Sequence, residues 1–397
     1  MINKIIIIGQ LLRDDYTSCE WIFKLFEYYL NKVTGLPVFC TVPQNYIEQR
    51  NEKYIPINVQ KIYNDYGVIR KEKRQVGRWQ KGKDWENAWA EIYYRTEYNK
   101  SAYEYIYSIF KDSLVISYEV EDCISAVFDY YNIPQIDINM DPIRFLEDVM
   151  LCFRTKNKAI YKKLLKYRVD EEFLYLSANY LKTNYSIGKY PNPKEKCVLF
   201  LGQTGCDKTL IVPEIKEIYT ILDHKEDFKN AVSGFDKILY KTHPLAVNDK
   251  ANLDFMCSLG NVEIVNKNFY ELISQDNIKK VVSVSSGTCS EAKYFGKEIQ
   301  NLLREGVPRQ TENKVDINKY VSIYQHTLSL NFWSDILSPV IKTKKYDKLI
   351  TIAGTKNKLR NSRIEFPIYW GYQDFDNLKL EKKIKQTMAV MENFLDE

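Results

Sequence analysis

A short apolar run that leads directly into a glycine-punctuated loop constrains this chain more than any other feature. It occupies residues 196–210, KCVLFLGQTGCDKTL, in which five apolar residues precede Gly202. Such a run, bounded by turn residues, predicts a fully covered strand of a parallel sheet. In open α/β sheets, ligands bind outside the carboxyl ends of the strands. The loop that carries Gln203 and Asp207 is therefore predicted to face a ligand site.

Two further predicted strands end on polar residues in the same half of the chain. One ends at the KTHP corner, 241–244, and the other at the SSGT segment, 285–288. At the corner, Lys241 and His243 could present two cationic donors to a phosphate or carboxylate, and a plain structural turn is the alternative. At the second end, a helix that starts near Cys289 would offer unpaired N–H groups to an anion, and ordinary N-capping is the alternative. Three such strand ends predict a cleft.

The first half of the chain alternates predicted strands and helices. Strands are predicted at 4–9, 38–42, 55–59, 114–118 and 134–138, and helices at 19–33 and 122–131. A further helix is predicted to begin at Asp141, with Ile143, Leu146, Met150 and Phe153 on its apolar face. This βαβα order is typical of a parallel sheet that is covered by helices.

A charged segment with two prolines, at 190–196, divides the chain. A second βα series follows it, with strands predicted near residues 197, 215, 238, 262 and 281. The predicted fold is therefore α/β, with two Rossmann-like domains whose parallel sheets face a central cleft. Residues 1–190 form the first domain and 196–340 the second, and the segment 341–397 is expected to cross back onto the first domain.

Composition narrows the classes of protein. The 397 residues are 45% hydrophobic and 27% charged, and no run approaches the ~20 apolar residues that span a bilayer. Eight cysteines without a CxxC pair fit reduced thiols in the cytoplasm. The net charge of +5 is spread along the chain, so no nucleic-acid partner is expected. It does allow peripheral association with an acidic membrane, such as the inner face of a bacterial inner membrane.

The sequence motifs argue against a metal or a bound cofactor. The P-loop, GxGxxG and HExxH patterns are absent, and the DxD at 374–376 lies in a charged tail and is interpreted as a solvated face. Two carboxylates remain as candidates for chemistry. Asp207 lies in the loop after one predicted strand, and Glu119 ends a strand of the other half. Two carboxylates on opposite walls of the predicted cleft suit the transfer of a glycosyl group. The alternative for Asp207 is that it is a surface turn residue.

Several of these segments, taken together, carry a family resemblance. They are GQTGCDKTL after a strand, the KTHP corner, SSGTCSEAKYFGK, and the segment NIPQIDINMDPIRFLEDVMLCFRT that follows Tyr118 and Glu119. Over roughly residues 110–340 the chain resembles the bacterial retaining β-Kdo glycosyltransferases, namely glycosyltransferase family ninety-nine and the related capsule Kdo transferases. The resemblance implies a GT-B-like fold, with the first domain on the acceptor side and the second holding the nucleotide sugar.

The resemblance also implies the reaction. The expected donor substrate is CMP-β-Kdo, and Kdo would be transferred, with retention of configuration, to a sugar of a lipopolysaccharide O-antigen or a capsule. The family's Q-x-x-x-D motif falls on Gln203 and Asp207, which makes Asp207 the expected nucleophile. The family's glutamate falls on Glu119, an expected acid/base. The chain departs from the family in having Gly205 and Cys206 before the aspartate.

Donor-binding residues follow from the same resemblance. His243, with Lys241 beside it, falls on the family's contact to the CMP phosphate and joins the catalytic set, although Thr242 replaces a proline of the family's corner. Arg144 would add positive field near the phosphate, so no metal is needed. The hydroxyl-rich loop supplies the expected nucleotide contacts, Ser285, Ser286 and Thr288.

Two other functions stay open from the sequence. An inverting CMP-sialic-acid-dependent sialyltransferase would also use a His-Pro corner and a Ser-rich loop, but it would need no nucleophile at Asp207. A non-catalytic glycan-binding module of a polysaccharide assembly would bind a glycan without releasing CMP.

Overall fold

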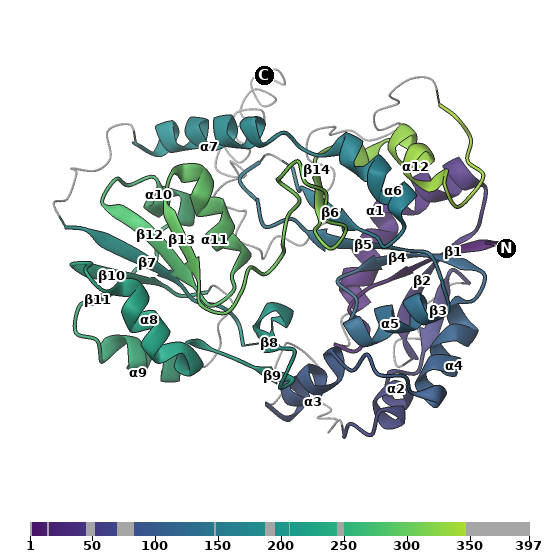
Figure 1. The fold of residues 1–397 in the computed structure, drawn as a ribbon, viewed down its shortest axis with the longest axis horizontal. Helices are drawn as coiled ribbons and strands as arrows, with labels where there is room; N and C mark the ends of the chain where they lie inside the picture. Colours follow the sequence, from purple (N-terminus) through teal and green to yellow (C-terminus); the bar gives the residue numbers. More distant parts are fainter. Residues whose placement is uncertain are drawn as a thin grey trace, which may run out of the picture.

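The protein consists of two α/β halves, each built around one sheet (Figure 1). The computed structural model describes residues 2–13, 16–44, 52–69, 83–146, 148–186, 195–205, 207–243 and 250–346. In Figure 1 the first sheet lies on the right and the second on the left, and α7 (Glu171–Ser186) crosses the upper side of the second half.

The first sheet has seven strands in the order β14-β6-β5-β4-β1-β2-β3. Its members are β1 (Lys4–Ile8), β2 (Val38–Pro43), β3 (Tyr54–Ile57), β4 (Ser113–Tyr118), β5 (Gln135–Met140), β6 (Leu151–Arg154) and β14 (Val321–Ile323). The pairs among β1 to β5 are parallel, whereas β6 is antiparallel to both β5 and β14. The sheet is therefore mixed, and not wholly parallel as the sequence predicted.

Alternating side chains of this sheet enter two different cores, as expected for a sheet that is covered on both faces. Ile5 and Ile7 pack with α1, α6 and α12, whereas Ile6 and Ile8 pack with α2, α3, α4 and α5. These helices are α1 (Tyr16–Thr34), α6 (Lys158–Leu164), α12 (Leu330–Leu337), α2 (Val59–Asp65), α3 (Lys83–Tyr93), α4 (Lys100–Phe110) and α5 (Asp122–Tyr130).

The second sheet is wholly parallel, with the order β11-β10-β7-β12-β13. Its strands are β7 (Cys197–Leu201), β10 (Lys237–Lys241), β11 (Val262–Ile264), β12 (Ile278–Ser283) and β13 (Glu298–Asn301). Its two cores are closed on one side by α7, α10 (Phe269–Ile273) and α11 (Gly287–Ala292), and on the other by α8 (Lys225–Val232) and α9 (Lys250–Cys257).

Both sheets share one Rossmann-like strand order. Counted along its own half, each sheet runs third-second-first-fourth-fifth strand, with β6 and β14 added at the edge of the first. The α/β, GT-B-like architecture predicted from the sequence is thereby confirmed.

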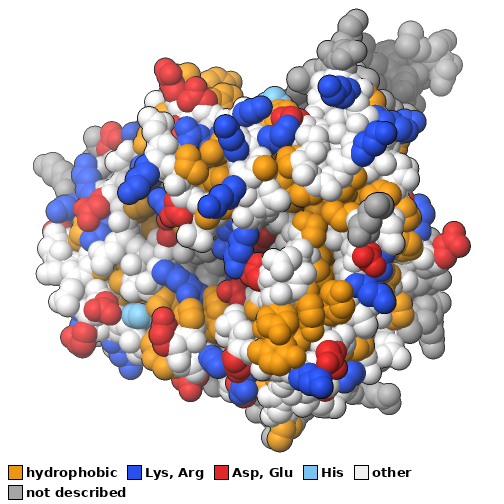
Figure 2. All heavy atoms as spheres, turned by 45° about the vertical axis from the view of Figure 1, so that its right-hand side comes forward, with side chains coloured by type: hydrophobic (Ala, Val, Ile, Leu, Met, Phe, Trp, Pro, Cys, Tyr) orange, Lys and Arg blue, Asp and Glu red, His pale blue; other side chains and the backbone are white. Residues whose placement is uncertain are grey.

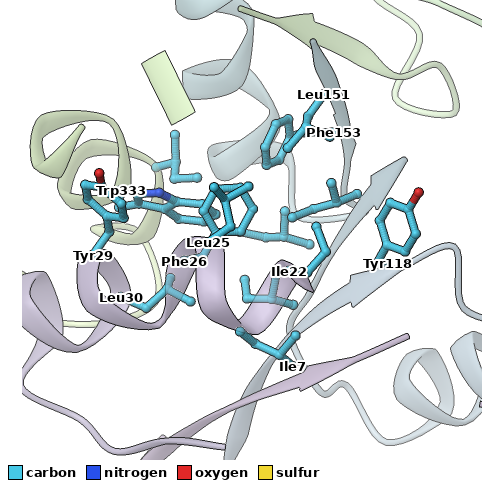
Figure 3. Close-up of a cluster of buried hydrophobic side chains, with 14 of the residues drawn as sticks. Ile7, Ile22, Leu25, Phe26, Tyr29, Leu30, Tyr118, Leu151, Phe153 and Trp333 are labelled. Carbon is cyan, nitrogen blue, oxygen red and sulfur yellow. The ribbon is translucent and has the colours of Figure 1, made fainter. Parts of the chain in front are cut away.

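The chain returns to the first half earlier than the sequence predicted. The predicted second domain ran to residue 340, but β14 pairs with β6, and Trp333 of α12 is fully buried in the core of the first half. Figure 3 shows Trp333 beside Phe26 and Tyr29 of α1, and the ring centroids of Phe26 and Trp333 lie 4.8 Å apart. The return is driven by this burial. Of the segment 341–397, which was predicted to cross back, only residues 341–346 are described by the structure.

The helix predicted from Asp141 is wrong. Its apolar residues are divided between two cores, since Ile143, Leu146 and Met150 enter the second half, whereas Phe153 enters the first. A single helix face cannot serve both cores. The segment instead makes a turn in which the Asp141 carboxylate accepts a hydrogen bond from the Ile143 N–H, 2.8 Å, and it then forms β6.

A small hairpin of the second half packs on the first half, at the core on the other face of the first sheet from Trp333. It consists of β8 (Ile211–Val212) and β9 (Glu217–Ile218), close to the strand predicted near residue 215. Ile211 is fully buried in a core of the first half, with Ile218 packed against that core.

No described helix is both long enough and apolar enough to cross a membrane.

Candidate active site

The carboxyl ends of the central strands in both sheets carry the candidate residues. In the first sheet, β1 and β4 are neighbours, and Gln10 and Glu119 follow them. In the second sheet, β7 and β12 are neighbours, and Gln203 and Ser285 follow them. These are the points at which the strand order reverses, where α/β sheets bind ligands. Figure 2 shows a hollow near the centre of one face, with basic and acidic side chains at its wall.

The strand-end loops of the second sheet are joined by side-chain hydrogen bonds. The Gln203 side chain accepts from the Ser285 N–H at 2.7 Å, and its Nε2 donates to Ser285 Oγ at 3.2 Å. Ser285 Oγ also lies 2.8 Å from Thr209 Oγ1. Thr209 in turn donates to Asp207 Oδ1 through both its N–H and its hydroxyl, each at 2.9 Å. Three of the predicted residues thus form one network with Thr209.

Asp207 is held by one of its two carboxylate oxygens. Oδ1 caps the short 3₁₀ turn Lys208–Leu210, as an aspartate does at a helix N-cap. Within the described residues, Oδ2 accepts no hydrogen bond. An oxygen that is fixed by its partner and has no donor of its own is geometrically suited to attack or to orient an electrophilic carbon.

The Asp207 loop is fixed from outside by Arg304 and Gly306. The Arg304 guanidinium donates to the Ile211 carbonyl at 2.7 Å, to the Lys208 carbonyl at 3.4 Å and to the Tyr94 hydroxyl at 3.0 Å. It therefore ties the loop to the first half. At Gly306 an added Cβ would lie 2.8 Å from the Ser285 carbonyl oxygen and 2.9 Å from Thr209 Cγ2, so only glycine allows this approach.

Glu119 lies across from this loop and is connected to it. Its backbone adopts φ 51°, which turns the chain sharply after β4. Glu119 Oε2 accepts from Gln10 Nε2 at 2.5 Å, and Oε1 lies 3.6 Å from the Lys208 ammonium. Since Lys208 directly follows Asp207, this ion pair brings the two predicted carboxylates to one site. Arg13 donates to Gln10 Oε1 at 3.0 Å and completes the chain of contacts.

His243 belongs to the same site, but not as the cation that the sequence suggested. Burial lowers the pKa of its imidazole below 6.5, and the charges of Arg144 and Lys241 lower it further, whereas Asp207 raises it. The ring is therefore mainly neutral at pH 7. The charges of Arg144, Lys241 and Asp207 therefore all act on the imidazole. Lys241 donates to the Lys267 carbonyl at 2.7 Å. The neighbouring proline, residue 244, lies outside the described residues.

Arg144 reaches the second half through its own backbone. Its N–H donates to Glu291 Oε1 at 2.7 Å, and the Tyr270 hydroxyl donates to the same oxygen at 2.8 Å. Burial raises the pKa of Glu291 to about 7. Next to this link, a Cβ at Gly287 would lie 3.0 Å from Pro142 Cβ, which shows how closely the first turn of α11 packs on the segment before Arg144.

Ser286 and Thr288 lie near the network without joining it. The Ser286 N–H donates to Ser283 Oγ at 3.0 Å, and Ser286 is the N-cap of α11 without a side-chain cap bond. Thr288 is partly buried in the first turn of α11, which has only six residues. Their predicted contacts with the nucleotide stay predictions.

Sequence reasoning missed several members of this site. Gln10 follows a predicted strand just as Glu119 does, so the rule that selected Glu119 would also have found it. Lys208 and Thr209 directly follow Asp207, a selected residue, and could have been included. Arg304 and Gly306 gave no local signal, because their roles depend on contacts across about a hundred residues. Across the part of the chain that the structure describes, no three His, Cys, Asp or Glu side chains gather as metal ligands.

Comparison with known proteins gives distant structural likenesses. No family model and no curated protein matches the chain. Among solved structures, the beta Kdo 2,7 transferase of Thermosulfurimonas dismutans KpsC is 15% identical, with a TM-score of 0.33 over 56% of this chain and 79% of that one. The beta Kdo 2,4 transferase of the same KpsC is 14% identical, with a TM-score of 0.33 over 56% and 78%. The Streptomyces sp. SF2575 glycosyltransferase SsfS6 is 9% identical, with a TM-score of 0.24 over 77% and 83%.

Proposed function

We propose that this protein is a glycosyltransferase that uses a nucleotide-sugar donor and a glycan acceptor. The observation that carries the proposal is the Lys208–Glu119 ion pair, which joins the Asp207 loop of one sheet to the carboxylate at the switch point of the other. Two carboxylates from facing sheets, with a neutral imidazole and two cations nearby, are a set suited to cleaving and remaking a glycosidic bond.

The donor that the site supports best is CMP-β-Kdo. Its leaving group is a phosphate, and Lys241 and Arg144 supply positive charge around His243. A metal is not required for that stabilisation, so none is proposed. The resemblance of the strand-end motifs to the β-Kdo transferases favours Kdo over other sugars. We propose a sugar of a lipopolysaccharide O-antigen or capsule as acceptor, and the cytoplasm, at the inner face of the inner membrane, as the location.

The proposed mechanism is a double displacement with retention. Asp207 Oδ2 attacks the anomeric carbon as the bond to the CMP phosphate oxygen breaks, and CMP leaves with that electron pair. His243 and Lys241 stabilise the phosphate. An acceptor hydroxyl then attacks the same carbon, the ester to Asp207 breaks, and Glu119 takes the proton from the acceptor.

The test is to incubate the protein with CMP-Kdo and to measure both CMP release and intact mass. We expect release of CMP and a mass increase of one Kdo unit that maps to Asp207. The Asp207→Asn variant keeps an oxygen that can cap the 3₁₀ turn but is a poor nucleophile. It should therefore fold normally, form no adduct and lose about 10³-fold or more in turnover.

Parallel samples distinguish the other functions. Turnover of CMP-sialic acid alone, unaffected by Asp207→Asn, would instead indicate an inverting sialyltransferase. A protein that binds a glycan but releases CMP from neither donor would be a binding module, and the enzymatic proposal would be wrong.

A further inference from the structure

The fold concentrates positive charge on one side of the first half. Residues 156–168, which include α6 and the turn after it, hold six Lys or Arg residues and no acidic residue. Residues 330–346, which form α12 and the segment after it, hold three lysines and one acidic residue, Asp335. These two segments therefore carry a net charge of +8, whereas the whole chain carries +5. The excess is thus not spread along the chain, as the sequence alone suggested.

The two segments lie side by side, although they are far apart in the chain. Lys163 of α6 forms an ion pair with Asp335 of α12. The Ser334 carbonyl accepts from Thr343 Oγ1 at 3.1 Å, and the Ser334 hydroxyl donates to the Lys344 carbonyl at 2.6 Å. The segment after α12 therefore folds back against the turn of α12 that holds Asp335, next to α6.

The other lysines of α6 and its following turn form a stripe that points away from the core. They recur at intervals of four residues, and this spacing keeps side chains on one face of a helix. The opposite side of α6 is buried through Ile160, Tyr161 and Leu164. Together with three lysines of the segment after α12, the stripe forms what we call the lysine face. Its six members, all exposed, are Lys158, Lys162, Lys166, Lys342, Lys344 and Lys345.

The lysine face has no anionic partner within the protein. Across the described residues, none of its six ammonium groups makes an ion pair or a hydrogen bond. The acidic residues at its border are engaged by other lysines, since Asp335 pairs with Lys163 and Asp129 of α5 pairs with Lys156. Like charges four residues apart destabilise a helix, so the stripe does not stabilise the fold. An anionic partner outside the protein would relieve this repulsion.

The chemistry of the lysine face favours a surface of anionic headgroups over nucleic acid. Its members are all lysines, which are flexible point charges, and not the planar arginine forks that bind phosphate in a bidentate way. Arg168, at its edge, donates to two backbone carbonyls of a neighbouring loop. The tyrosines of this region offer no stacking platform for bases, because Tyr161 is buried and the Tyr167 ring packs 5.1 Å from that of Phe332.

We propose that the lysine face binds the surface of a bilayer that contains acidic phospholipids, and so attaches the first half to a membrane. Each lysine close to such a surface strengthens binding about fivefold. The second half has no such excess, because residues 197–301 hold twelve basic and fourteen acidic residues. Figure 2 shows basic side chains gathered on the upper part of the molecule, at the height where Figure 1 places α6 and α12. The inference rests on the proposed function only in taking the inner membrane as this bilayer.

The test is co-sedimentation of the full chain with vesicles, which needs neither donor nor acceptor. Vesicles of phosphatidylglycerol and phosphatidylethanolamine are compared with vesicles of phosphatidylcholine, at about 0.05 M and about 0.5 M salt. One variant combines Lys158→Ala, Lys162→Ala and Lys166→Ala, and a second replaces the three lysines after α12 in the same way.

The matched control removes the same amount of charge from the second half. It combines substitutions of three exposed lysines, Lys225→Ala, Lys250→Ala and Lys279→Ala. All the substituted side chains are exposed, so each variant should fold normally, which circular dichroism checks.

We expect wild type to bind the acidic vesicles at low salt, to lose most of this binding at high salt, and to leave the phosphatidylcholine vesicles unbound. Each variant of the lysine face should lose about 100-fold in its partition coefficient for the acidic vesicles. The control should stay within about threefold of wild type.

Several results would overturn the proposal. Wild type might bind neither kind of vesicle or both equally, or the control might lose as much binding as the variants of the lysine face. A protein that leaves the acidic vesicles unbound but binds duplex DNA through the lysine face would have nucleic acid as its partner. None of these results bears on the release of CMP, which is measured in solution, so failure of this inference and failure of the proposed function are distinguishable.

Discussion

At the scale of single residues, the site depends on carboxylates whose oxygens have different partners. Asp207 uses Oδ1 to cap a turn and keeps Oδ2 without a donor among the described residues, whereas both oxygens of Glu119 are engaged, by Gln10 and Lys208. A group with one fixed and one open oxygen suits a nucleophile. A carboxylate with partners on both oxygens suits a residue that transfers a proton, because such a residue must be held in one position.

Gln10 is the residue expected to position Glu119. Replacing it in Gln10→Leu removes the donor to Oε2 and the acceptor for Arg13, with little change in volume. We expect kcat for transfer to fall about 10-fold or more, since a misplaced acid/base is penalised, while KM for CMP-Kdo changes little. Steady-state kinetics would check this. The control is Gln60→Leu on α2, whose amide bonds the exposed Asn64. An unchanged kcat in Gln10→Leu would contradict the role.

His243 should make donor binding depend on pH. Its pKa is below 6.5 in the free protein because the ring is buried, and a bound phosphate would raise it. Binding of CMP should therefore take up a proton, and affinity should increase as pH falls from 8 towards the pKa of the free protein, then level off. Calorimetry in buffers of different ionisation enthalpy measures this uptake. CMP itself titrates in this range, so the comparison is with His243→Asn, which should lack the protein's share. Equal uptake in both proteins would exclude His243.

At the scale of elements, the donor site is a set of strand-end loops whose spacing is fixed by close packing. The loop after β13 contributes no side chain to the proposed chemistry, yet Gly306 touches both Ser285 and Thr209, and Arg304 holds the Asp207 turn against Tyr94. The precision of the Asp207 position is therefore determined by a loop about a hundred residues further along the chain.

Gly306→Ala tests that dependence. The new methyl group would approach the Ser285 carbonyl oxygen to 2.8 Å, and Ser285 is fully buried, so the backbone must shift. We expect a loss of about 1–3 kcal/mol in the free energy of unfolding and weaker CMP binding. Denaturant unfolding and CMP titration measure the two effects. Gly205→Ala is the control, because no atom of the described residues lies within 4 Å of the position that its new methyl group would take. Equal behaviour of the two variants would refute the packing argument.

Element by element, the sequence predicted what is local and missed what depends on two cores. Apolar runs that end on polar residues located β4, β7, β10 and β12, and with them Glu119, Gln203, Asp207, His243 and Ser285. The periodicity after Asp141 predicted a helix, but burial in two separate cores required a turn and β6 instead. β13 holds only one apolar residue, Ile299, and so offers no apolar run to recognise. Arg304 acts through carbonyl groups that any sequence would supply.

At the scale of the whole molecule, buried ionisable groups link the halves and make stability depend on pH. Arg309 is buried and contacts Asp141 at 3.4 Å and Glu171 at 3.2 Å, joining the segment before Arg144 to the start of α7. Glu291 joins the same segment to α11 through the Arg144 N–H. At these contacts, charged and polar groups of the two halves therefore bind one another in place of water.

Glu291→Gln should remove one source of this pH dependence. The pKa of Glu291 is raised by burial to about 7 in the folded protein, against 4.5 for an ordinary glutamate. Stability from the protonated form is complete below pH 4.5 and is lost as pH rises through 7. The amide keeps the acceptor oxygen without ionising. We expect Glu291→Gln to equal wild type near pH 5 and to exceed it by about 1–3 kcal/mol at pH 8.

Urea unfolding at the two pH values measures the difference. Glu121 has a pKa raised by burial to about 7 as well, and it is present in both proteins, so its contribution cancels. Glu226→Gln, at an exposed position of α8, serves as control. A variant that is less stable than wild type at pH 8 would mean that the fold favours the ionised carboxylate, and that the pKa of Glu291 is not raised.

The return of α12 to the first half has a consequence for biosynthesis. Trp333 fills a core whose other walls include α1 and the strands β1 to β6 of the first sheet, all made before residue 155 (Figure 3). During translation that apolar surface stays uncovered after β6 has been made, until about 180 further residues, up to Trp333, have left the ribosome. The newly made first half therefore passes through a stage in which α1 is uncovered, and a fragment that ends at residue 190 should aggregate unless a peptide spanning 321–346 is supplied with it.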